Sequence, residues 1–272
     1  MNMEEIKLRA PAKLNLHLEV VKKRSDGFHD LCSLFTLIEL FDDITFKKNS
    51  NSVELIESIP IKQNIVLKAA NLLKDLFSVK EGVKIELVKS IPDQKGLGGG
   101  SSDAASTLLG LRKFWNLDIS DQDLAEIALT LGSDVPFFIY GKTAWAEGRG
   151  EILAEYPYKK KYYLLFLPAL KISTKNAFEQ ASFVSRPKIS KKNFTSDQSF
   201  NSFEVWIRRT YSEMDEAFNN LRLIGEPKLS GTGSTIFLEF DNKSAAESAQ
   251  KHFPELVLTK SLERSPLMQI IE

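Results

Sequence analysis

The sequence predicts an α+β fold, in which helices and strands are mixed without a strict alternation of the two. Segments whose apolar side chains recur at every second residue predict strands, and segments where they recur every three or four residues predict helices. Both kinds occur along the whole 272-residue chain, which is long enough for one large domain or two small ones. We place a boundary just after the Gly148-Arg149-Gly150 turn, which divides the chain into residues 1–152 and residues 153–272.

The first strand is predicted from a strict alternation. From residue 13 to residue 20, lysine, asparagine, histidine and glutamate alternate with three leucines and a valine. Because successive side chains of a strand point to opposite faces, the pattern indicates one buried face and one polar face, and Lys13 and Asn15 share the polar one. In the N-terminal half we expect strands at residues 7–21, 31–47 and 83–87, and helices at 65–77, 104–115 and 124–131.

Capping residues mark the ends of several of these helices. Asn64 stands where the first helix needs an N-cap, and Ser120 with Asp123 resembles a capping box before the third. Gly132 fits the position that follows a helix. In the C-terminal half we expect strands at residues 162–167, 235–240 and 256–258, helices at 174–181, 207–221 and 245–253, and an exposed polar loop at 184–200.

Composition narrows the class of protein. The chain carries 36 basic and 36 acidic side chains, and the zero formal net charge argues against a general nucleic-acid binder. Its single cysteine cannot form an internal disulfide, and its three histidines are too far apart in sequence for a structural zinc site. We find no apolar run of the ~20 residues that a membrane span needs, and no secretory signal. We therefore expect a soluble, cytoplasmic protein; its oligomeric state is not readable from the sequence.

The strongest local motif is a glycine-rich segment between an expected strand and an expected helix. Residues 96–103 read Gly-Leu-Gly-Gly-Gly-Ser-Ser-Asp. Glycines let the backbone approach a ligand closely, and the start of a helix offers free N–H groups and the positive end of its dipole, so the segment is suited to phosphate. A loop that merely leads into a helix is the alternative. A second Gly/Ser turn at residues 230–234 would let two loops hold one polyphosphate.

Three segments resemble the motifs of the GHMP kinases, a family that includes galactokinase, homoserine kinase and mevalonate kinase. They are Ala-Pro-Ala-Lys-Leu-Asn-Leu at residues 10–16, the glycine-rich region at residues 92–105, and Leu-Ser-Gly-Thr-Gly-Ser at residues 229–234. The resemblance spans nearly the whole chain and implies a two-domain fold with the active site in the cleft between the domains. It also implies ATP as the phosphoryl donor, with Mg²⁺. We identify no carboxylate that matches a metal ligand, so no metal-binding residue is predicted.

Two further segments resemble one group of family members. Residues 24–29, Arg-Ser-Asp-Gly-Phe-His, and residues 132–137, Gly-Ser-Asp-Val-Pro-Phe, are similar to members that phosphorylate the 2-hydroxyl of a cytidine diphosphate methylerythritol in the non-mevalonate route to isoprenoid precursors. In those members the first segment reads the cytosine base, since an aromatic ring can stack on a base and an imidazole can bond to its edge. Phe28 stands where tyrosine is frequent, which keeps the stacking and removes a phenol contact.

Four alternatives remain within the same resemblance. The chain could be a kinase for homoserine or for a mevalonate-type acid, a decarboxylase of a mevalonate diphosphate, or a non-catalytic nucleotide sensor. Phe28 and His29 argue against the first three, whose substrates have no cytosine. The presence of both Lys13 and Asp134 argues against a sensor. A nucleic-acid role for the basic stretch at residues 186–192 is disfavoured because that stretch is short.

The resemblance assigns roles residue by residue. Lys13 matches the catalytic lysine, and Asp134 matches the acid that orients the acceptor hydroxyl and takes its proton late, with Lys13 keeping it ionised. Without the resemblance, a solvated strand face and a turn would account for these two residues. The other assigned residues are Asn64, Lys89, Pro92, Asp93, Gln94, Lys95, Gly96, Leu97, Gly98, Gly99, Gly100, Ser101, Ser102, Gly231 and Gly233 for ATP, and Asn15, Phe28, His29, Thr174 and Phe178 for the acceptor.

Overall fold

The computed structural model describes residues 4–61, 64–180 and 189–270, and its mixture of helices and strands confirms the α+β prediction. The N-terminal half runs β1 (Glu5–Lys23), β2 (His29–Asn49), β3 (Val53–Glu57), α1 (Ile65–Leu76), β4 (Gly82–Val88), α2 (Gly99–Phe114), α3 (Asp121–Leu131), α4 (Val135–Tyr140), β5 (Ala144–Gly148) and β6 (Ile152–Glu155). The C-terminal half runs β7 (Tyr162–Phe166), α5 (Thr174–Gln180), η1 (Ser196–Gln198), α6 (Glu204–Thr210), α7 (Ser212–Leu221), β8 (Lys228–Leu229), β9 (Ile236–Phe240), α8 (Lys243–Gln250), β10 (Val257–Leu262) and η2 (Pro266–Ile270).

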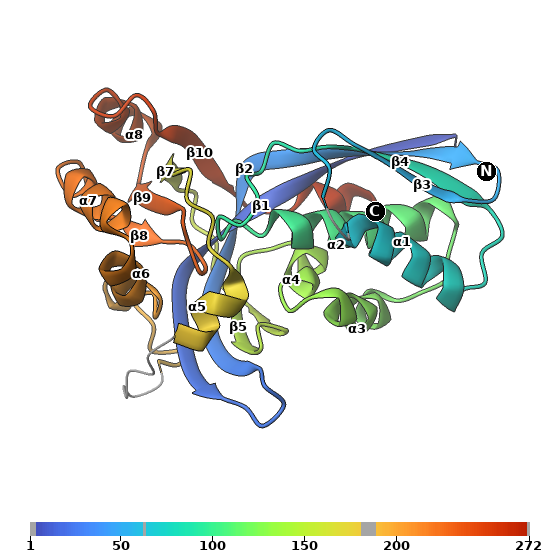
Figure 1. Ribbon diagram of the computed structural model, residues 1–272, viewed down its shortest axis with the longest axis horizontal. Helices are drawn as coiled ribbons and strands as arrows, with labels where there is room; N and C mark the ends of the chain where they lie inside the picture. Colours follow the sequence, from blue (N-terminus) through green and yellow to red (C-terminus); the bar gives the residue numbers. More distant parts are fainter. Residues whose placement is uncertain (1–3, 62–63, 181–188, 271–272) are drawn as a thin grey trace.

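The two halves share one sheet. Its strand order is β3–β4–β2–β10–β7–β9–β8, with β1 and β5 also paired to β2, and β6 paired to β5. The long strands β1 and β2 run from the end covered by α1 to α4 toward the end where α6 and α7 lie (Figure 1). Strand β10 pairs with β2 and with β7, and so connects the halves. The proposed boundary falls within β6, and it stays a prediction.

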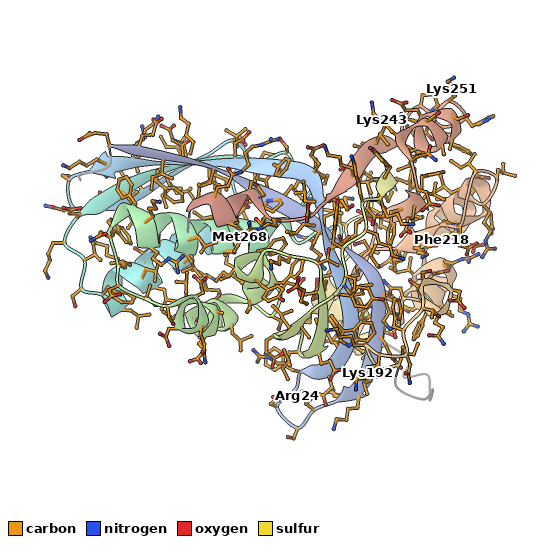
Figure 2. All side chains as sticks on the ribbon, turned by 180° about the vertical axis from the view of Figure 1, so that it is seen from behind. Arg24, Lys192, Phe218, Lys243, Lys251 and Met268 are labelled. Carbon is orange, nitrogen blue, oxygen red and sulfur yellow. The ribbon has the colours of Figure 1, made fainter. Side chains whose placement is uncertain are left out.

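Apolar side chains form two large cores, each drawing some residues from both halves, with a small cluster between them. The first core lies between α1–α4 and the sheet, and the second lies under α6, α7 and α8. The intervening cluster includes Leu14, Ile91 and Phe237, so it draws on both halves. Burial of each such side chain stabilises the fold by about 1.5–3 kcal/mol. Figure 2 shows Phe218 of the second core in the smaller lobe on the right, and Met268 of the C-terminal segment in the larger lobe near the middle of the molecule.

The predicted helix caps are confirmed in part. The Asn64 side chain accepts a hydrogen bond from the Val66 N–H at 2.9 Å, and the Ser120 hydroxyl accepts one from the Asp123 N–H at 3.1 Å. Gly132 does end α3, but its φ of 172° is extended backbone that any residue adopts. Glycine is therefore not required there for conformational reasons.

Several element boundaries differ from the prediction. Helix α2 begins at Gly99 rather than at residue 104, so residues 99–103 of the glycine-rich segment are helical. The single helix expected over residues 207–221 is two helices, because Tyr211 adopts extended backbone with φ −122° and ψ 104°. The last strand is longer than expected, and the sequence patterns did not predict β3, α4, β5 and β6. Among the described residues, no helix has both the length and the apolar composition that crossing a bilayer requires.

Strand β1 departs from strict alternation at a bulge. Asn15 pairs with Phe35 and His17 pairs with Leu34, so Leu16 is an extra residue in the ladder. An inserted residue exchanges the two faces of a strand beyond it. Lys13 and Asn15 consequently face the cleft described below, whereas His17 stacks on Trp145 away from it. Both Lys13 and His17 are buried, so the alternative of a solvated polar face on β1 is excluded.

The polar loop expected at 184–200 is not uniformly exposed. Residues 184–188 lie outside the described residues. In the remainder, Phe194 is buried, and its ring centroid lies 5.2 Å from those of both His17 and Trp145. At the other end of the chain, Leu267 in η2 is fully buried in the first core, so the C-terminal segment packs on the N-terminal half.

Candidate active site

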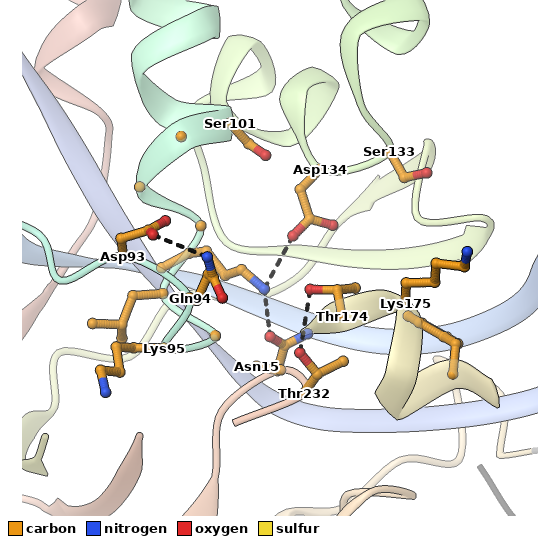
Figure 3. Close-up of a pocket in the computed structure, with 18 of the residues that line it drawn as sticks. Asn15, Asp93, Gln94, Lys95, Ser101, Ser133, Asp134, Thr174, Lys175 and Thr232 are labelled. Atoms are coloured by element: carbon orange, nitrogen blue, oxygen red, sulfur yellow. Dashed lines mark hydrogen bonds and ion pairs between the residues drawn. The ribbon is translucent and has the colours of Figure 1, made fainter. Parts of the chain in front are cut away.

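A cleft of about 890 Å³ lies where the two halves meet. Its walls come from the middle of β1, the start of β2, the glycine-rich segment, the residues before α4, the β5–β6 turn and helix α5. This volume suits a small molecule of nucleotide size. Figure 3 shows that the labelled polar side chains come from segments far apart in the sequence, among them Asn15, Asp134 and Thr232.

Lys13 is the cation at the centre of this cleft. Its Nζ lies 3.2 Å from Asp134 Oδ2 and donates a hydrogen bond to Asn15 Oδ1, as the dashed lines in Figure 3 mark. The same ammonium lies 4.9 Å from the centroid of the Phe35 ring. The side chain of Lys13 is 3% exposed and that of Asp134 is 33% exposed. A buried cation therefore contacts a carboxylate that remains open to a ligand.

The position of Asp134 follows from the local sequence. Val135 and Pro136 begin α4, and proline is well tolerated in the first turn of a helix because it has no N–H to leave unpaired. Asp134 occupies the N-cap position, but its carboxylate turns to Lys13. Asn15 is held in turn by Ser33, whose hydroxyl accepts a hydrogen bond from Asn15 Nδ2 at 2.9 Å. Neighbouring strands thus fix the lysine and the amide together.

The glycine-rich segment lies against Lys13. The Lys13 N–H donates to the Leu97 carbonyl at 3.0 Å, which ties the loop to β1. Gly98 has a φ of +70°, and a Cβ there would lie 2.9 Å from Phe138 and 3.0 Å from Lys13 Cγ. Helix α2 starts at the next residue, so its free N–H groups and the positive end of its dipole face the cleft. This arrangement forms a cradle for phosphate oxygens beside the Lys13 ammonium.

The second Gly/Ser loop supports the first. The Ser230 hydroxyl donates to the Gly96 carbonyl at 2.8 Å, and a Cβ on Gly96 would lie in contact with the Ser230 backbone. Gly231 packs on the backbone of Gly96 and lines the cleft together with Thr232. The two loops are therefore directly packed on each other. Through these contacts the C-terminal half fixes the position of the phosphate cradle.

Lys95 points out of the cradle. It is 6% exposed, and its ammonium donates to the carbonyl oxygens of Pro168 and Leu170 in the C-terminal half. Burial, followed by the charge of Lys171, lowers the pKa of Lys95. In Figure 3 the Lys95 ammonium is directed away from Asp134. Its side chain ties the two halves together while its backbone continues the phosphate loop.

Lys89 lies at the other end of the cradle, between two buried carboxylates. Its Nζ is 2.5 Å from Asp42 Oδ2 and 2.6 Å from Asp103 Oδ2. Burial alone would lower the pKa of Lys89, but the charges of Asp103 and Asp42 outweigh it and raise this pKa. Burial raises the pKa of Asp103 to about 7. Two acids share one cation here, which holds the strand end and the first turn of α2 together.

The residues expected to read cytosine gather at the opposite end of the cleft. Phe28 is 47% exposed and follows Asp26, whose carboxylate accepts a hydrogen bond from the Phe28 N–H at 3.1 Å. The rings of His29 and Phe178 stack with centroids 5.1 Å apart. Burial, followed by the charge of Lys23, lowers the pKa of His29, so its ring is neutral at pH 7. A neutral imidazole has one donor and one acceptor nitrogen.

Nearly all the assigned residues line this one cleft. The exceptions are Ser102, which is buried in α2, and Gly233, which packs against Ile207. Thr174 lines the cleft, and its hydroxyl lies 3.5 Å from that of Thr232. The lining residues that sequence reasoning missed include Lys23, Ser133, Arg149, Lys175 and Thr232.

Comparison with known proteins agrees with this geometry. The family model described as the GHMP kinases N terminal domain matches residues 64–142, and the model described as GHMP kinases C terminal matches residues 191–257. A relative from Acinetobacter baylyi is 38% identical, over 96% of this chain and 97% of its own length. The chain belongs to the GHMP kinase family.

Individual relatives and solved structures show which members of the GHMP kinase family the chain is similar to. The Acinetobacter baylyi protein is named 4-diphosphocytidyl-2-C-methyl-D-erythritol kinase, as is a relative from Actinobacillus pleuropneumoniae that is 37% identical over 98% of this chain and 97% of its own length. A crystal structure of 4-(cytidine 5′-diphospho)-2C-methyl-D-erythritol kinase matches with a TM-score of 0.83 and 29% identity, over 94% of this chain and 99% of the other. The homoserine kinase of Cytophaga hutchinsonii matches with a TM-score of 0.71 and 16% identity, over 97% of this chain and 96% of the other, and so shows the fold alone.

As a GHMP kinase the chain acts as an ATP-dependent phosphotransferase on an alcohol. The cleft contains the parts this chemistry requires: an amide-lined cradle, a buried cation and an accessible carboxylate. Phosphoryl transfer depends mainly on positioning and on stabilising charge, because its transition state is loose. Lys13 lies between the cradle and Asp134, where it can neutralise charge as it develops.

Proposed function

We propose that this GHMP kinase transfers the γ-phosphoryl group of ATP to the 2-hydroxyl of 4-diphosphocytidyl-2-C-methyl-D-erythritol, in the non-mevalonate route to isoprenoid precursors. The relatives named above carry this activity in their names. The observation that carries the proposal is the ion pair of Lys13 and Asp134 at 3.2 Å, in a cleft with a phosphate cradle at one end and an aromatic cluster at the other.

On the donor side, the backbone of Gly98 to Ser101 holds the phosphates of ATP. The N–H groups of the first turn of α2 donate to the phosphate oxygens, and the dipole of this helix favours their charge. Asn64 and Lys89 line the cleft on the side where the adenosine would lie. The Asn64 side chain caps α1 and the Lys89 ammonium pairs with two carboxylates, so both have a structural role as well.

On the acceptor side, Asp134 accepts a hydrogen bond from the 2-hydroxyl and orients its oxygen toward the γ-phosphorus. The hydroxyl proton passes to the Asp134 carboxylate late in the transfer, because little bonding to the nucleophile has formed before then. Lys13 stabilises the Asp134 carboxylate and the transferring phosphoryl oxygens together. Asn15 holds the Lys13 ammonium in place.

At the far end of the cleft, the cytosine base lies among Phe28, His29 and Phe178. An aromatic ring contributes about 1–3 kcal/mol of stacking per base in single-strand complexes, which sets the scale for Phe28. The neutral ring of His29 can hydrogen-bond to the edge of the base. Thr174 lies at the start of α5, next to the second glycine loop, where it would contact the sugar part of the acceptor.

A magnesium ion fits this donor set. Mg²⁺ takes oxygen ligands and is bound in kinases largely through the nucleotide phosphates. The Ser101 hydroxyl and the Asp134 carboxylate both line the cleft, and Figure 3 shows them on neighbouring segments. Because the Asp134 carboxylate takes the hydroxyl proton, the Ser101 hydroxyl would hold the ion or one of its water ligands. The ion would neutralise charge on the phosphates as ADP leaves.

Both substrates are highly charged metabolites, and we therefore place this activity in the cytoplasm. The partners of the protein are ATP and the acceptor; we propose no nucleic-acid or membrane partner. The net charge of zero agrees with this, because a nucleic-acid or anionic-membrane binder gains from a basic excess.

A coupled assay of ADP release tests the proposal. The purified protein with ATP and Mg²⁺ is given the cytidine diphosphate methylerythritol, homoserine or mevalonate as acceptor, with a no-acceptor control for ATP hydrolysis. We expect turnover with the first acceptor only. Turnover with homoserine or mevalonate instead would identify another kinase of the same family. Inactivity on all three, with ATP bound, would support a nucleotide sensor.

A further inference from the structure

The turn between β5 and β6 contains an arginine that faces the cleft. In the sequence, Gly148-Arg149-Gly150 indicates only a turn at a domain boundary. Arg149 lines the cleft, and its guanidinium carbon lies 4.2 Å from the centroid of the Phe28 ring. Its backbone N–H donates to Glu151 Oε2 at 2.5 Å, and Gly148 adopts a φ of +69°. The turn is thus fixed by its own contacts, and the arginine side chain extends from it.

The Arg149 guanidinium is not committed to a carboxylate. Within the described parts of the chain it makes no side-chain hydrogen bond or ion pair, whereas Arg24, Arg112 and Arg208 each contact an aspartate within 3.0 Å. Nearby Asp26 is held by Arg24. Stacking on a ring uses the face of a guanidinium and leaves its edge N–H groups directed outward. Those N–H groups suit an anion that arrives from the cleft.

The location of Arg149 identifies that anion, if the proposed function holds. A Cβ on the adjacent Gly150 would lie 3.8 Å from the Asp134 carboxylate, so this turn borders the site of phosphoryl transfer. The guanidinium at its tip lies over Phe28, at the end that reads the base. In the proposed acceptor, the diphosphate is the part that joins the reacting alcohol to the cytidine. We infer that Arg149, stacked on Phe28, binds the diphosphate of the acceptor.

This assignment gives Arg149 a specificity role. Guanidinium groups bind phosphate oxygens through two parallel hydrogen bonds, which fixes the orientation of the diphosphate as well as its charge. A nucleoside that lacks the diphosphate would keep the base contacts and lose this one. The contribution of Arg149 therefore depends on the phosphates of the ligand.

Calorimetric binding of cytidine diphosphate and of cytidine tests the inference. The donor site is first saturated with a non-hydrolysable ATP analogue, so that the ligands report on the acceptor site. Arg149→Gln is compared with the unaltered protein and with Lys175→Gln, which removes an equal charge from a mostly exposed side chain on the same cleft. We expect Arg149→Gln to weaken cytidine diphosphate about 10- to 100-fold, the scale of a charge-assisted contact, and to leave cytidine unchanged. Arg149→Lys should restore part of the loss, and Lys175→Gln should have little effect.

Other outcomes overturn the inference in distinguishable ways. Equal weakening of both ligands by Arg149→Gln would mean that the arginine acts only by ordering Phe28. No weakening of either would remove it from the acceptor site, while cytidine binding by the unaltered protein would still support the proposed function. If the unaltered protein binds neither ligand but binds the ATP analogue, the proposed function itself fails, and this inference with it.

Discussion

Lys13 contacts a carboxylate, an amide and an aromatic ring at once, and each contact comes from a different segment. A lysine is costly to bury unless it is paired, and the Asp134 carboxylate at 3.2 Å is its partner. In the proposed mechanism, Lys13 stabilises the charge of Asp134 during transfer. The reaction therefore depends on the geometry of this one ion pair.

Replacing Asp134 by asparagine removes the proton acceptor and keeps the shape of the side chain. We expect kcat to fall by about 10²–10⁴-fold, the usual contribution of general-base catalysis, with little change in the KM of ATP. Asp118→Asn is the control, since Asp118 is exposed, lies outside the cleft and has no assigned part in binding or proton transfer. Steady-state kinetics of the two variants would contradict the account if both kept kcat or lost it equally.

Residues with one dominant role were predictable from the sequence, and those whose role depends on a fold contact were not. Lys13 and Asp134 were found because they lie in recognisable motifs, and the structure brings them together. Arg149 was missed because a Gly-Arg-Gly turn carries no signal of what it faces. Lys95 was expected at the phosphates, yet its ammonium binds two carbonyls of the other half, which nothing local could indicate.

At the scale of elements, the phosphate cradle is one continuous strand-loop-helix unit. Its conformation depends on Gly96 and Gly98, which both have positive φ and both lack room for a side chain. Periodicity located α2 but not its start, because glycines and serines carry no apolar stripe. The bulge in β1 was missed for a related reason. The extra residue, Leu16, is one of the alternating leucines, so the apolar pattern of the sequence continues through the bulge. The break at Tyr211 likewise lies inside an intact apolar stripe.

Two nearby glycines, Gly98 and Gly100, differ in whether their backbone conformation requires glycine. Gly98→Ala places a Cβ at positive φ and 2.9 Å from Phe138, so we expect a loss of at least about 1–2 kcal/mol of stability and a higher KM for ATP. Gly100→Ala meets only Ile65 at 3.9 Å inside a helix, where alanine is favoured by about 0.5–1 kcal/mol. Thermal unfolding of both variants checks this. Equal melting temperatures would show that the conformation of Gly98 is not required.

At the scale of the whole molecule, the β1–β2 hairpin separates two environments. One face lines the cleft, and the other packs His17 against Trp145, Phe194 and Phe200. Burial, followed by the charge of Lys228, lowers the pKa of His17 to about 4. The Glu19 carboxylate and the Cys32 thiol also lie within 4.8 Å of the His17 ring nitrogen. The imidazole is neutral in the folded protein and would gain a proton on unfolding in mild acid.

This burial makes stability depend on pH in a defined direction. Between pH 6.5 and about 4 the unfolded chain binds a proton at His17 that the folded chain does not, so the free energy of unfolding falls as the pH falls through this window. Because of His17, the free energy of unfolding is about 3 kcal/mol larger above pH 6.5 than below about pH 4. Urea unfolding at pH 7 and pH 4 measures this decrease in the free energy of unfolding. We expect it to be smaller in His17→Phe, which keeps a ring, than in the unaltered protein. Parallel losses in both proteins would mean that His17 does not carry the effect.

The fold class and the order of most elements followed from the sequence, but the arrangement of the halves did not. The sheet continues from β3 to β8 through β2 and β10, and this pairing joins residues more than 200 positions apart. The cleft exists because of that pairing and of the contact between the two glycine loops. Local patterns carry no information about such contacts, whereas the family resemblance did.

The most direct test of the account is proton-coupled phosphorus-31 NMR of the product that the protein forms from ATP and the cytidine diphosphate methylerythritol. The accepting carbon bears a methyl group and no hydrogen, so phosphate on the 2-hydroxyl gives a monoester signal without three-bond splitting by a carbinol proton. We expect this unsplit signal to appear in step with ADP, and to be nearly absent with Asp134→Asn. A split monoester signal, or inorganic phosphate alone, would show that the cleft does not deliver phosphate to that alcohol.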